Sequence, residues 1–325
     1  MSRSKRPDRS RAKRGPAKGA KPGPAKPGPA KPGVAKPGAA KSGGAGDRPK
    51  REKGAKRGGR SRERERRVAR LDPRHHPVPG ERAVVELLRA SPTRVRRLLL
   101  EEGRRFESLE ALAAEALGER VTIERVEREI FDDLIGPGLA RGVLAVTRPP
   151  RRWDFEALLE GGPEAEGGEA VRTRRGHRII VLLDGVQDPH NLGAVIRNAE
   201  FFGATAVVWG QDRAAPLSAV AVRSSAGATE RLPLGQVTNV ARALEQAKAS
   251  GTWWVVGTVV DEGTPVHEFA QDPPSDMILV LGSEERGMRR LTRERCDFLV
   301  TIARGGSLGS LNVSAAGAVA LAKLA

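Results

Sequence analysis

The sequence predicts an α/β protein whose C-terminal part contains a parallel sheet. Apolar strands alternate with helices twice, once over residues 78–148 and again over residues 176–325. Strands of the second alternation, such as the run at 178–185 with its apolar residues 179–183, are apolar on consecutive positions, which is typical of parallel sheets covered by helices on both faces. The first 75 residues differ from both segments, because they contain no aromatic residue and are rich in Lys, Pro, Gly and Ala. Such a composition indicates a disordered tail ahead of the folded part.

The first alternation begins at about Gly80, where the composition becomes globular. We expect helices over 81–91, 108–117 and 127–136, with Ser108 opening the second, and strands over 95–103, 120–126 and 142–148. These elements predict a small three-layer α/β domain over 78–148. Nothing in this domain indicates catalysis.

A linker is expected over residues 149–175, with a short helix near Trp153 and an acidic, glycine-rich stretch at 161–170. The second alternation follows it. We expect strands over 178–185, 205–210, 253–260, 277–282 and 298–304, helices over 190–203, 239–249 and from about 311 to the C-terminus, a further helix through Val220, and a turn at 232–235. Ligands of such sheets bind at the carboxyl ends of the strands.

The net charge of +17 is concentrated in the tail. The first 75 residues hold 26 Lys and Arg against 6 Asp and Glu, which leaves 31 basic and 34 acidic residues in the other 250. A five-residue unit, PAKPG and its variants, repeats there and places Lys21, Lys26, Lys31, Lys36 and Lys41 at equal spacing. We expect residues 1–77 to hold RNA phosphates without sequence preference, with a simple solubility tail as the alternative.

Because the folded part is slightly acidic overall, RNA contacts there are expected from local arginine clusters. Two such clusters are Arg94, Arg96 and Arg97, and Arg172, Arg174 and Arg175.

Several classes of protein are disfavoured. The single cysteine, Cys296, excludes a disulfide framework and a cysteine-rich metal site, and it favours a reducing, cytoplasmic location. We expect no signal peptide and no membrane-spanning run, and we find no dinucleotide-binding glycine motif, P-loop or hydrolase nucleophile elbow in the sequence. The five histidines show no metal-ligand spacing, so we expect no metal site.

Three loops at predicted strand ends carry unusual residues. The first, 184–204, holds Asn191, where a helix should begin, and Arg197 six residues later. The second, 281–288, brackets Glu284 between Gly282 and Gly287, and the third, 303–321, contains Ser310 and Asn312 as possible helix caps. Each loop alone has an ordinary explanation, such as a helix cap, a surface arginine or a strand–glycine turn. The helix after the third loop is rich in Ala and Gly, which indicates very close packing.

Together and in this order, the loops resemble motifs 1, 2 and 3 of the SpoU (TrmH-like) RNA ribose 2′-O-methyltransferases. Motif 1 is matched in register by Asp184, Val186, Asp188, Pro189, Asn191, Gly193, Ala194, Arg197, Ala199, Phe202 and Gly203. The stretch LVLGSEERGM is similar to motif 2, and SLNVS at 310–314 to the core of motif 3. The domain at 78–148 resembles the L30e-like substrate domain of the branch that modifies a guanosine of 23S rRNA. The resemblance covers about 78–325.

The resemblance implies an S-adenosylmethionine-dependent methyltransferase acting on a ribose 2′-hydroxyl of RNA, most plausibly a guanosine of 23S rRNA. It also implies a trefoil-knotted parallel-sheet (SPOUT) domain over 176–325 and a homodimer with sites at the subunit interface. Backbone groups of Gly282, Ile302 and Leu311 would hold the cofactor. Arg197 would act on the 2′-hydroxyl, and the residues that orient it with ribose and cofactor would be Asn191, Glu284, Ser310 and Asn312. The chain departs from the usual Pro-Met after the motif 3 isoleucine, because Ile302 is followed by Ala303 and Arg304.

Three other functions remain open. One is the same methyl transfer to tRNA, which is disfavoured because tRNA-modifying relatives generally lack an L30e-like module. Another is a non-catalytic RNA-binding ribosome-assembly factor, against which the intact motif residues argue. A dinucleotide-dependent enzyme is the third and has the least support.

Overall fold

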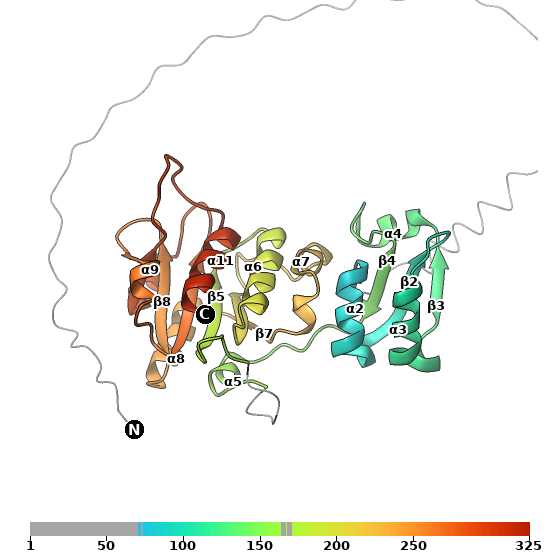
Figure 1. Ribbon diagram of the computed structural model, residues 1–325, viewed down its shortest axis with the longest axis horizontal. Helices are drawn as coiled ribbons and strands as arrows, with labels where there is room; N and C mark the ends of the chain where they lie inside the picture. Colours follow the sequence, from blue (N-terminus) through green and yellow to red (C-terminus); the bar gives the residue numbers. More distant parts are fainter. Residues whose placement is uncertain (1–70, 73, 164–166, 168–170) are drawn as a thin grey trace, which may run out of the picture. The chain divides into compact units, whose positions relative to one another are not determined.

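The computed structural model describes residues 71–72, 74–163, 167 and 171–325, and these form two β-sheets with their helices (Figure 1). Almost all of the basic tail expected over 1–77 lies outside the described residues. So does most of the acidic stretch at 161–170.

The first sheet has four strands in the order β1-β4-β2-β3. They are β1 (His76–Pro79), β2 (Val95–Glu101), β3 (Ile123–Val126) and β4 (Val143–Thr147). β2 and β3 are parallel, whereas β4 runs antiparallel to both β1 and β2. The sequence did not predict β1, which begins slightly before the expected boundary at residue 78. Its two prolines disfavour an inner strand, but β1 lies at the edge of the sheet, where proline is tolerated.

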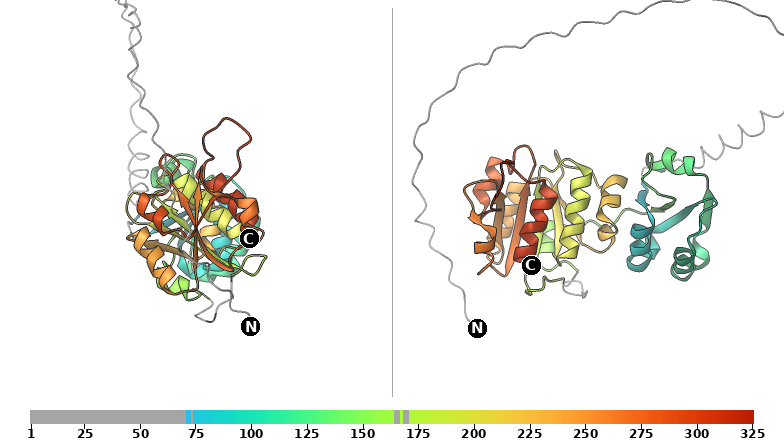
Figure 2. Two further views of the ribbon diagram at one scale, coloured as in Figure 1. Left: turned by 90° about the vertical axis from the view of Figure 1, so that its left-hand side faces the viewer. Right: turned by 45° about the horizontal axis from the view of Figure 1, so that its top comes forward.

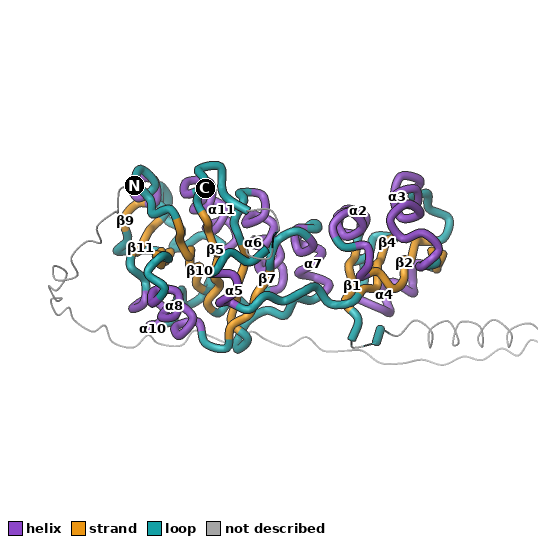
Figure 3. The backbone as a smooth tube through the Cα atoms, turned by 90° about the horizontal axis from the view of Figure 1, so that it is seen from below, coloured by secondary structure: helices purple, strands orange, loops and turns teal. Residues whose placement is uncertain are grey.

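Helices cover both faces of this sheet, as the three-layer prediction required (Figure 3). Alternate residues of β2 point to opposite sides, so Leu98 and Leu100 pack with α2 (Glu81–Ala90) and α3 (Glu107–Leu117), while Leu99 packs with α4 (Arg128–Ile135). The expectation that Ser108 opens α3 is wrong. The helix starts one residue earlier, at Glu107, and no side chain caps it.

The second sheet has seven strands in the order β7-β6-β5-β10-β8-β11-β9, and every pairing is parallel. Its strands are β5 (Arg178–Asp184), β6 (Ala206–Gly210), β7 (Leu234–Val237), β8 (Trp254–Val259), β9 (Thr264–Pro265), β10 (Asp276–Gly282) and β11 (Phe298–Thr301). The turn expected at 232–235 is wrong, because β7 begins at Leu234. At Gly235 a Cβ would lie 3.0 Å from the carbonyl oxygen of Trp153, and this edge strand is too short to show a periodic pattern.

Both faces of the second sheet are buried, as the apolar strands predicted. Ile179 and Val181 pack with α6 (Pro189–Phe201), α7 (Ala219–Ser225) and α11 (Val313–Leu324), whereas Ile180 and Leu182 pack with α5 (Phe155–Leu159) and α8 (Val240–Ala249). Figures 2 and 3 show α6 and α11 side by side on one face. The short helices α9 (Val266–Phe269) and α10 (Arg290–Arg295) complete the region.

The closely packed C-terminal helix was predicted from its small residues. A Cβ on Gly317 would lie 2.8 Å from Cδ1 of Leu281 in β10, and Asn198 of α6 donates to the carbonyl oxygen of Ser314 over 2.9 Å. The small side chains of α11 therefore let it lie close to both β10 and the neighbouring α6.

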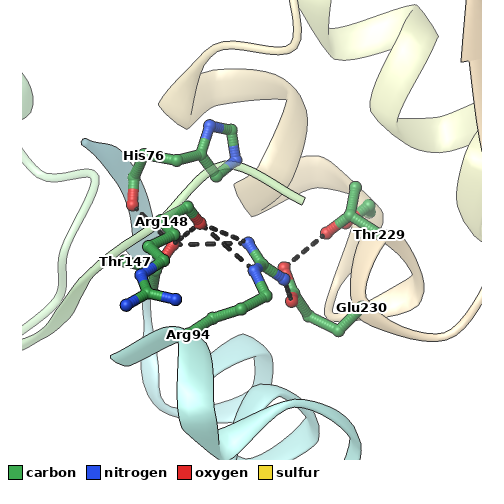
Figure 4. Close-up of polar contacts among 7 residues, drawn as sticks. His76, Arg94, Thr147, Arg148, Thr229 and Glu230 are labelled. Atoms are coloured by element: carbon green, nitrogen blue, oxygen red, sulfur yellow. Dashed lines mark hydrogen bonds and ion pairs between the residues drawn. The ribbon is translucent and has the colours of Figure 1, made fainter. Parts of the chain in front are cut away.

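A buried ion pair joins the 3₁₀ turn Pro92–Arg94 to a second such turn, Ala228–Glu230 (Figure 4). The Glu230 side chain is fully buried, and burial raises its pKa. The Arg94 guanidinium also donates to the carbonyl oxygen of Arg148 over 3.0 and 3.1 Å. Burial, with the positive charges of Arg94 and Arg152, lowers the pKa of nearby His76 to about 4.

Two arginines of the expected RNA-binding cluster therefore form ion pairs with carboxylates of the protein itself. Arg94 is engaged with Glu230, and Arg97 makes a two-pronged contact with Glu124 at 2.7 Å for each bond. Arg96 remains exposed.

No helix in the described ranges is long and apolar enough to cross a membrane.

Candidate active site

Side chains from the three predicted loops meet at one edge of the second sheet. Because all its strands are parallel, the loops that follow β5, β10 and β11 leave from the same edge. The Asn191 amide donates to Glu284 and accepts a hydrogen bond from Nδ2 of Asn312 over 2.9 Å. Three predicted site residues, far apart in sequence, thus form one hydrogen-bonded chain.

Helix caps hold two of the three loops in place. Asp188, not Asn191, caps α6: its Oδ1 accepts from the backbone N of His190 over 2.9 Å, and Pro189 occupies the first turn. Asn191 therefore lies within the first turn, with its side chain free to reach Glu284. Asn312 caps α11 as expected, since its Oδ1 accepts from the backbone N of Ser314 over 2.9 Å.

A cavity of about 1020 Å³ lies beside this chain of side chains. Its walls come from the loops after β8, β10 and β11. Five residues of the predicted site line it: Gly282, Glu284, Ile302, Ser310 and Leu311. Predicted residues from two distant motifs therefore lie in the walls of one cavity, whereas the wall from the loop after β8 was not predicted.

Gly282 has the closest neighbouring backbone of the glycines in the cavity wall. Ser283 and Gly287 exchange two backbone hydrogen bonds of 2.8 and 3.1 Å, which close the loop after β10 into a narrow turn. A Cβ on Gly282 would lie 2.2 Å from the backbone N of Met288 and 2.3 Å from the carbonyl carbon of Gly287. Only glycine fits there, because the obstructing atoms are backbone.

Arg197 does not join the other site residues. It lies on the exposed side of α6 and is not part of the cavity wall. Among the described residues, no hydrogen bond or ion pair involves its guanidinium. Phe201, one helical turn further along, is 78% exposed, so this side of α6 carries a cation and a bare aromatic ring.

Asp184 matches motif 1 in the sequence, but its role was not predicted. Its side chain is fully buried at the end of β5, where Oδ2 accepts from the backbone N of Arg289 over 2.8 Å and Oδ1 lies 3.5 Å from the Arg289 guanidinium. Asp184 thus attaches the C-terminal end of the loop 281–288, at Arg289, to the sheet. The sequence signal for a structural role of Asp184 is that an acidic residue ends a run of five apolar residues.

Cys296 has a structural position next to the same loop. Its Sγ contacts Sδ of Met288 at 4.0 Å and donates to the carbonyl oxygen of Thr292 over 3.4 Å. Burial is the main cause that raises the pKa of the thiol to about 12, which disfavours the reactive thiolate at physiological pH.

Comparison with known proteins identifies the family. Residues 178–322 match the SpoU rRNA methylase family, and residues 77–153 match the family described as RNA 2′-O ribose methyltransferase substrate binding. The 23S rRNA (guanosine-2′-O-)-methyltransferase RlmB of Pseudomonas putida is 41% identical over 244 residues, which cover 75% of this chain and 93% of that protein. The chain belongs to the SpoU rRNA methylase family. It is an enzyme of the methyltransferase class, as the motifs indicated.

Other members of the SpoU family agree in sequence and in fold. RlmB of Yersinia pestis is 38% identical over 247 residues, covering 75% of this chain and 94% of that protein. The SpoU methyltransferase AviRb of Streptomyces viridochromogenes, solved in complex with AdoMet, is 25% identical with a TM-score of 0.61, over 81% of this chain and 96% of that chain. The α/β class with a parallel sheet and the recognition of the family are thus confirmed.

Replacing Gly282 by alanine should destroy the SpoU motif 2 loop. The added methyl group would strike backbone atoms of Gly287 and Met288, which can move only if the Ser283–Gly287 pairing opens. We expect a lower unfolding midpoint and loss of AdoMet binding by calorimetry. The matched control is Gly210→Ala at the end of β6, outside the cavity wall, where a Cβ would make only ordinary contacts of 3.6 and 3.7 Å. Unchanged AdoMet affinity in the Gly282 variant would contradict this account of the cavity.

Proposed function

We propose that this enzyme transfers a methyl group from S-adenosylmethionine (AdoMet) to the ribose 2′-hydroxyl of a guanosine in 23S rRNA, in the cytoplasm. The observation that carries this proposal is the meeting of Asn191, Glu284 and Asn312 beside the cavity. The RlmB relatives support 23S rRNA as the substrate. They are named 23S rRNA (guanosine-2′-O-)-methyltransferases, and this chain matches them over 93% and 94% of their length.

The residues that line the cavity fit AdoMet. The cavity is large enough to hold a ligand that contains a nucleoside. The glycines at 305, 306 and 309 present backbone without side chains, since a Cβ there would meet nothing within 4 Å. We propose that backbone groups of Gly282, Ile302 and Leu311 hold the adenosine part. AdoMet, when bound, supplies an electrophilic methyl group.

The side chains of the site would orient the reacting hydroxyl. Asn191 is held on one side by Glu284 and on the other by Asn312, so its amide has a fixed direction. Fixed polar groups of this kind accelerate a transfer by aligning the nucleophile with the methyl group. We propose that Ser310, at the cavity wall, contributes to the same alignment.

Arg197 would act as a cation on the RNA. A guanidinium stays protonated in proteins, so we assign it to clamp the phosphate beside the target ribose and to lower the pKa of the 2′-hydroxyl. Its absence from the cavity wall and its exposure beside Phe201 favour action across a homodimer, in which α6 of one subunit faces the cavity of the other. The exposed apolar side chains Leu308 and Leu311 on the cavity loop would lie in the same interface.

The proposed organisation has four parts. These are a basic tail over 1–77, an L30e-like substrate-binding domain over 78–148, a linker over 149–175 and a catalytic domain over 176–325. We propose further that the C-terminal segment is threaded as a trefoil knot. The close passage of α11 past Leu281 and the contact of Asn312 with Asn191 support this, because a threaded chain needs small residues where backbones cross.

A transfer assay tests the substrate. The full chain is incubated with tritiated AdoMet and either 23S rRNA or total tRNA, and the modified nucleoside is identified by mass spectrometry. We expect 2′-O-methylguanosine in 23S rRNA. Label in tRNA alone would support the tRNA alternative, and failure of the chain to bind AdoMet would support a non-catalytic assembly factor.

Removing residues 1–70 should weaken RNA binding most at low salt. The logarithm of RNA affinity falls linearly with the logarithm of the salt concentration. Each phosphate contact that is lost makes this negative slope shallower by about 0.7 to 0.9, because fewer counterions are released on binding. The matched control keeps the tail length but replaces Lys21, Lys26, Lys31, Lys36 and Lys41 by glutamine. We expect this control to lose part of the slope in filter-binding titrations. A slope identical to that of the intact chain after truncation would support the solubility-tail alternative.

A further inference from the structure

The segment 302–312, between β11 and α11, is a cavity wall with little packing of its own. Residues 303–312 are all exposed, and a Cβ added at Gly305, Gly306 or Gly309 would meet nothing within 4 Å. Within the described chain, the hydrogen bonds that residues 303–311 make are both formed by the guanidinium of Arg304. One side chain therefore holds a stretch that glycine would otherwise leave free to adopt many conformations.

Arg304 ties this segment in two directions. Its Nη1 donates to the carbonyl oxygen of Gly309 over 3.1 Å, which closes the turn on itself. Its Nη2 lies 2.6 Å from Oδ1 of Asp261, in the loop after β8, which attaches the turn to the neighbouring wall. A guanidinium can make both contacts at once because its donors diverge in one plane, whereas an ammonium group lacks this geometry.

The loop that carries Asp261 is itself firmly held. Its neighbour Glu262 pairs with Arg293 of α10 at 2.8 Å, and Val260 accepts a hydrogen bond of 2.8 Å from Thr301 through its carbonyl oxygen. At Gly263 a Cβ would lie 2.8 Å from the carbonyl carbon of Val300, so this loop lies directly against β11. Asp261 is thus a fixed point to which Arg304 can fasten the glycine-rich segment.

We propose that Arg304 is a positioning residue for the cofactor, and that its pair with Asp261 holds the segment 302–312 in the conformation that receives AdoMet. The inference rests on the proposed function, because Ile302 and Leu311 flank this pair on the segment. A wall that is already ordered loses less conformational entropy when the ligand binds, so affinity rises without a new contact to the ligand.

Calorimetry with AdoMet on the full chain tests the proposal. Arg304 and Asp261 are 45% and 68% exposed, so the pair is partly screened, and we expect Arg304→Ala to weaken AdoMet binding by about threefold to fivefold. Arg304→Lys should behave like alanine, and the exchanged pair Arg304→Asp with Asp261→Arg should recover part of the affinity. The matched control is Arg290→Ala, which breaks an exposed ion pair with Glu294 of 2.6 Å outside the cavity and should leave the affinity unchanged.

A second measurement needs no AdoMet. A nitroxide label on Ser307→Cys reports the mobility of the segment, since Cys296 is packed against Met288 and reacts slowly. We expect sharper spectral lines after Arg304→Ala but not after Arg290→Ala. Unchanged lines together with unchanged affinity would overturn the proposal. Failure of the wild-type chain to bind AdoMet would instead overturn the proposed function, and the spectra would still decide whether Arg304 restrains the segment.

Discussion

Replacement of Arg197 by alanine is expected to abolish methyl transfer while the fold and AdoMet binding are retained. Arg197 is exposed on α6 and lies outside the cavity wall, so its loss leaves no buried group without a partner. Removing one group that stabilises developing charge at a reacting oxygen typically costs a factor of about 10² to 10³ in rate. We expect a loss of at least this size in tritium transfer to 23S rRNA fragments, with unchanged AdoMet affinity by calorimetry.

The control for this variant is Arg242→Ala. Arg242 is also an exposed helical arginine, but it lies on α8, which covers the opposite face of the sheet. Its replacement should leave the rate unchanged. Full activity of the Arg197 variant would remove Arg197 from the mechanism.

Mixing two inactive variants tests whether Arg197 acts across subunits. Arg197→Ala keeps an intact cavity, and Gly282→Ala keeps an intact arginine. If the two groups come from different subunits, mixed dimers contain one complete site, and random exchange restores about a quarter of the wild-type activity. No recovery, in a mixture whose exchange is verified, would assign Arg197 to the cavity of its own chain.

The second large effect is expected from Arg94→Ala, on stability. This substitution leaves the Glu230 carboxylate buried without its cation, and breaking a buried pair in this way costs about 3 to 5 kcal/mol. The remaining partner of Glu230, the Thr229 hydroxyl at 3.3 Å, is a neutral donor and does not replace the charge. We expect a corresponding fall in the free energy of unfolding in urea, followed by tryptophan fluorescence.

The pH dependence gives this effect a signature. Burial already raises the pKa of Glu230, and removal of Arg94 raises it further. A carboxyl whose pKa is higher in the folded than in the unfolded state binds its proton preferentially when folded, so stability recovers as the pH falls towards the unfolded value. The penalty of Arg94→Ala should therefore be smaller at pH 5 than at pH 8. A penalty that is independent of pH would contradict the burial of an ionised Glu230.

Two further variants separate charge from packing. Arg290→Ala breaks an exposed pair and should cost less than about 1 kcal/mol. Adding Glu230→Gln to Arg94→Ala removes the buried charge and should recover much of the lost stability. If it does not, lost packing of the Arg94 side chain explains the effect.

Much of the fold could be predicted because the large strands are regular. Residues 179–183 and 277–281 are apolar at consecutive positions, and such strands are buried on both faces wherever they pair. The elements that were missed or mistaken are short or at an edge. β1 and β7 have four residues each and depend on neighbouring strands, so tertiary contacts decide them.

The candidate site divides in the same way. Its residue types and their order are local properties, and they identified the family, the cavity-wall glycine and the asparagines. The pairing of Asn191 with Glu284 and Asn312 required the parallel sheet to bring three loops to one edge. The burial of Arg94 could not be predicted, because a surface arginine and a buried one look the same in the sequence. The carboxylate that pairs with Arg94 belongs to Glu230, which is 136 residues away in the chain.

The sequence by itself therefore determined the fold class, the family and the chemical groups of the site, since these depend on periodicity and on residues in fixed local order. The tertiary structure alone decided which charges are free. Arg197 is left exposed, Arg304 is tied to Asp261, and Arg94 is buried against Glu230. The physical reason is that burial and ion pairing depend on distances between residues remote in sequence, and local patterns carry no information about those distances.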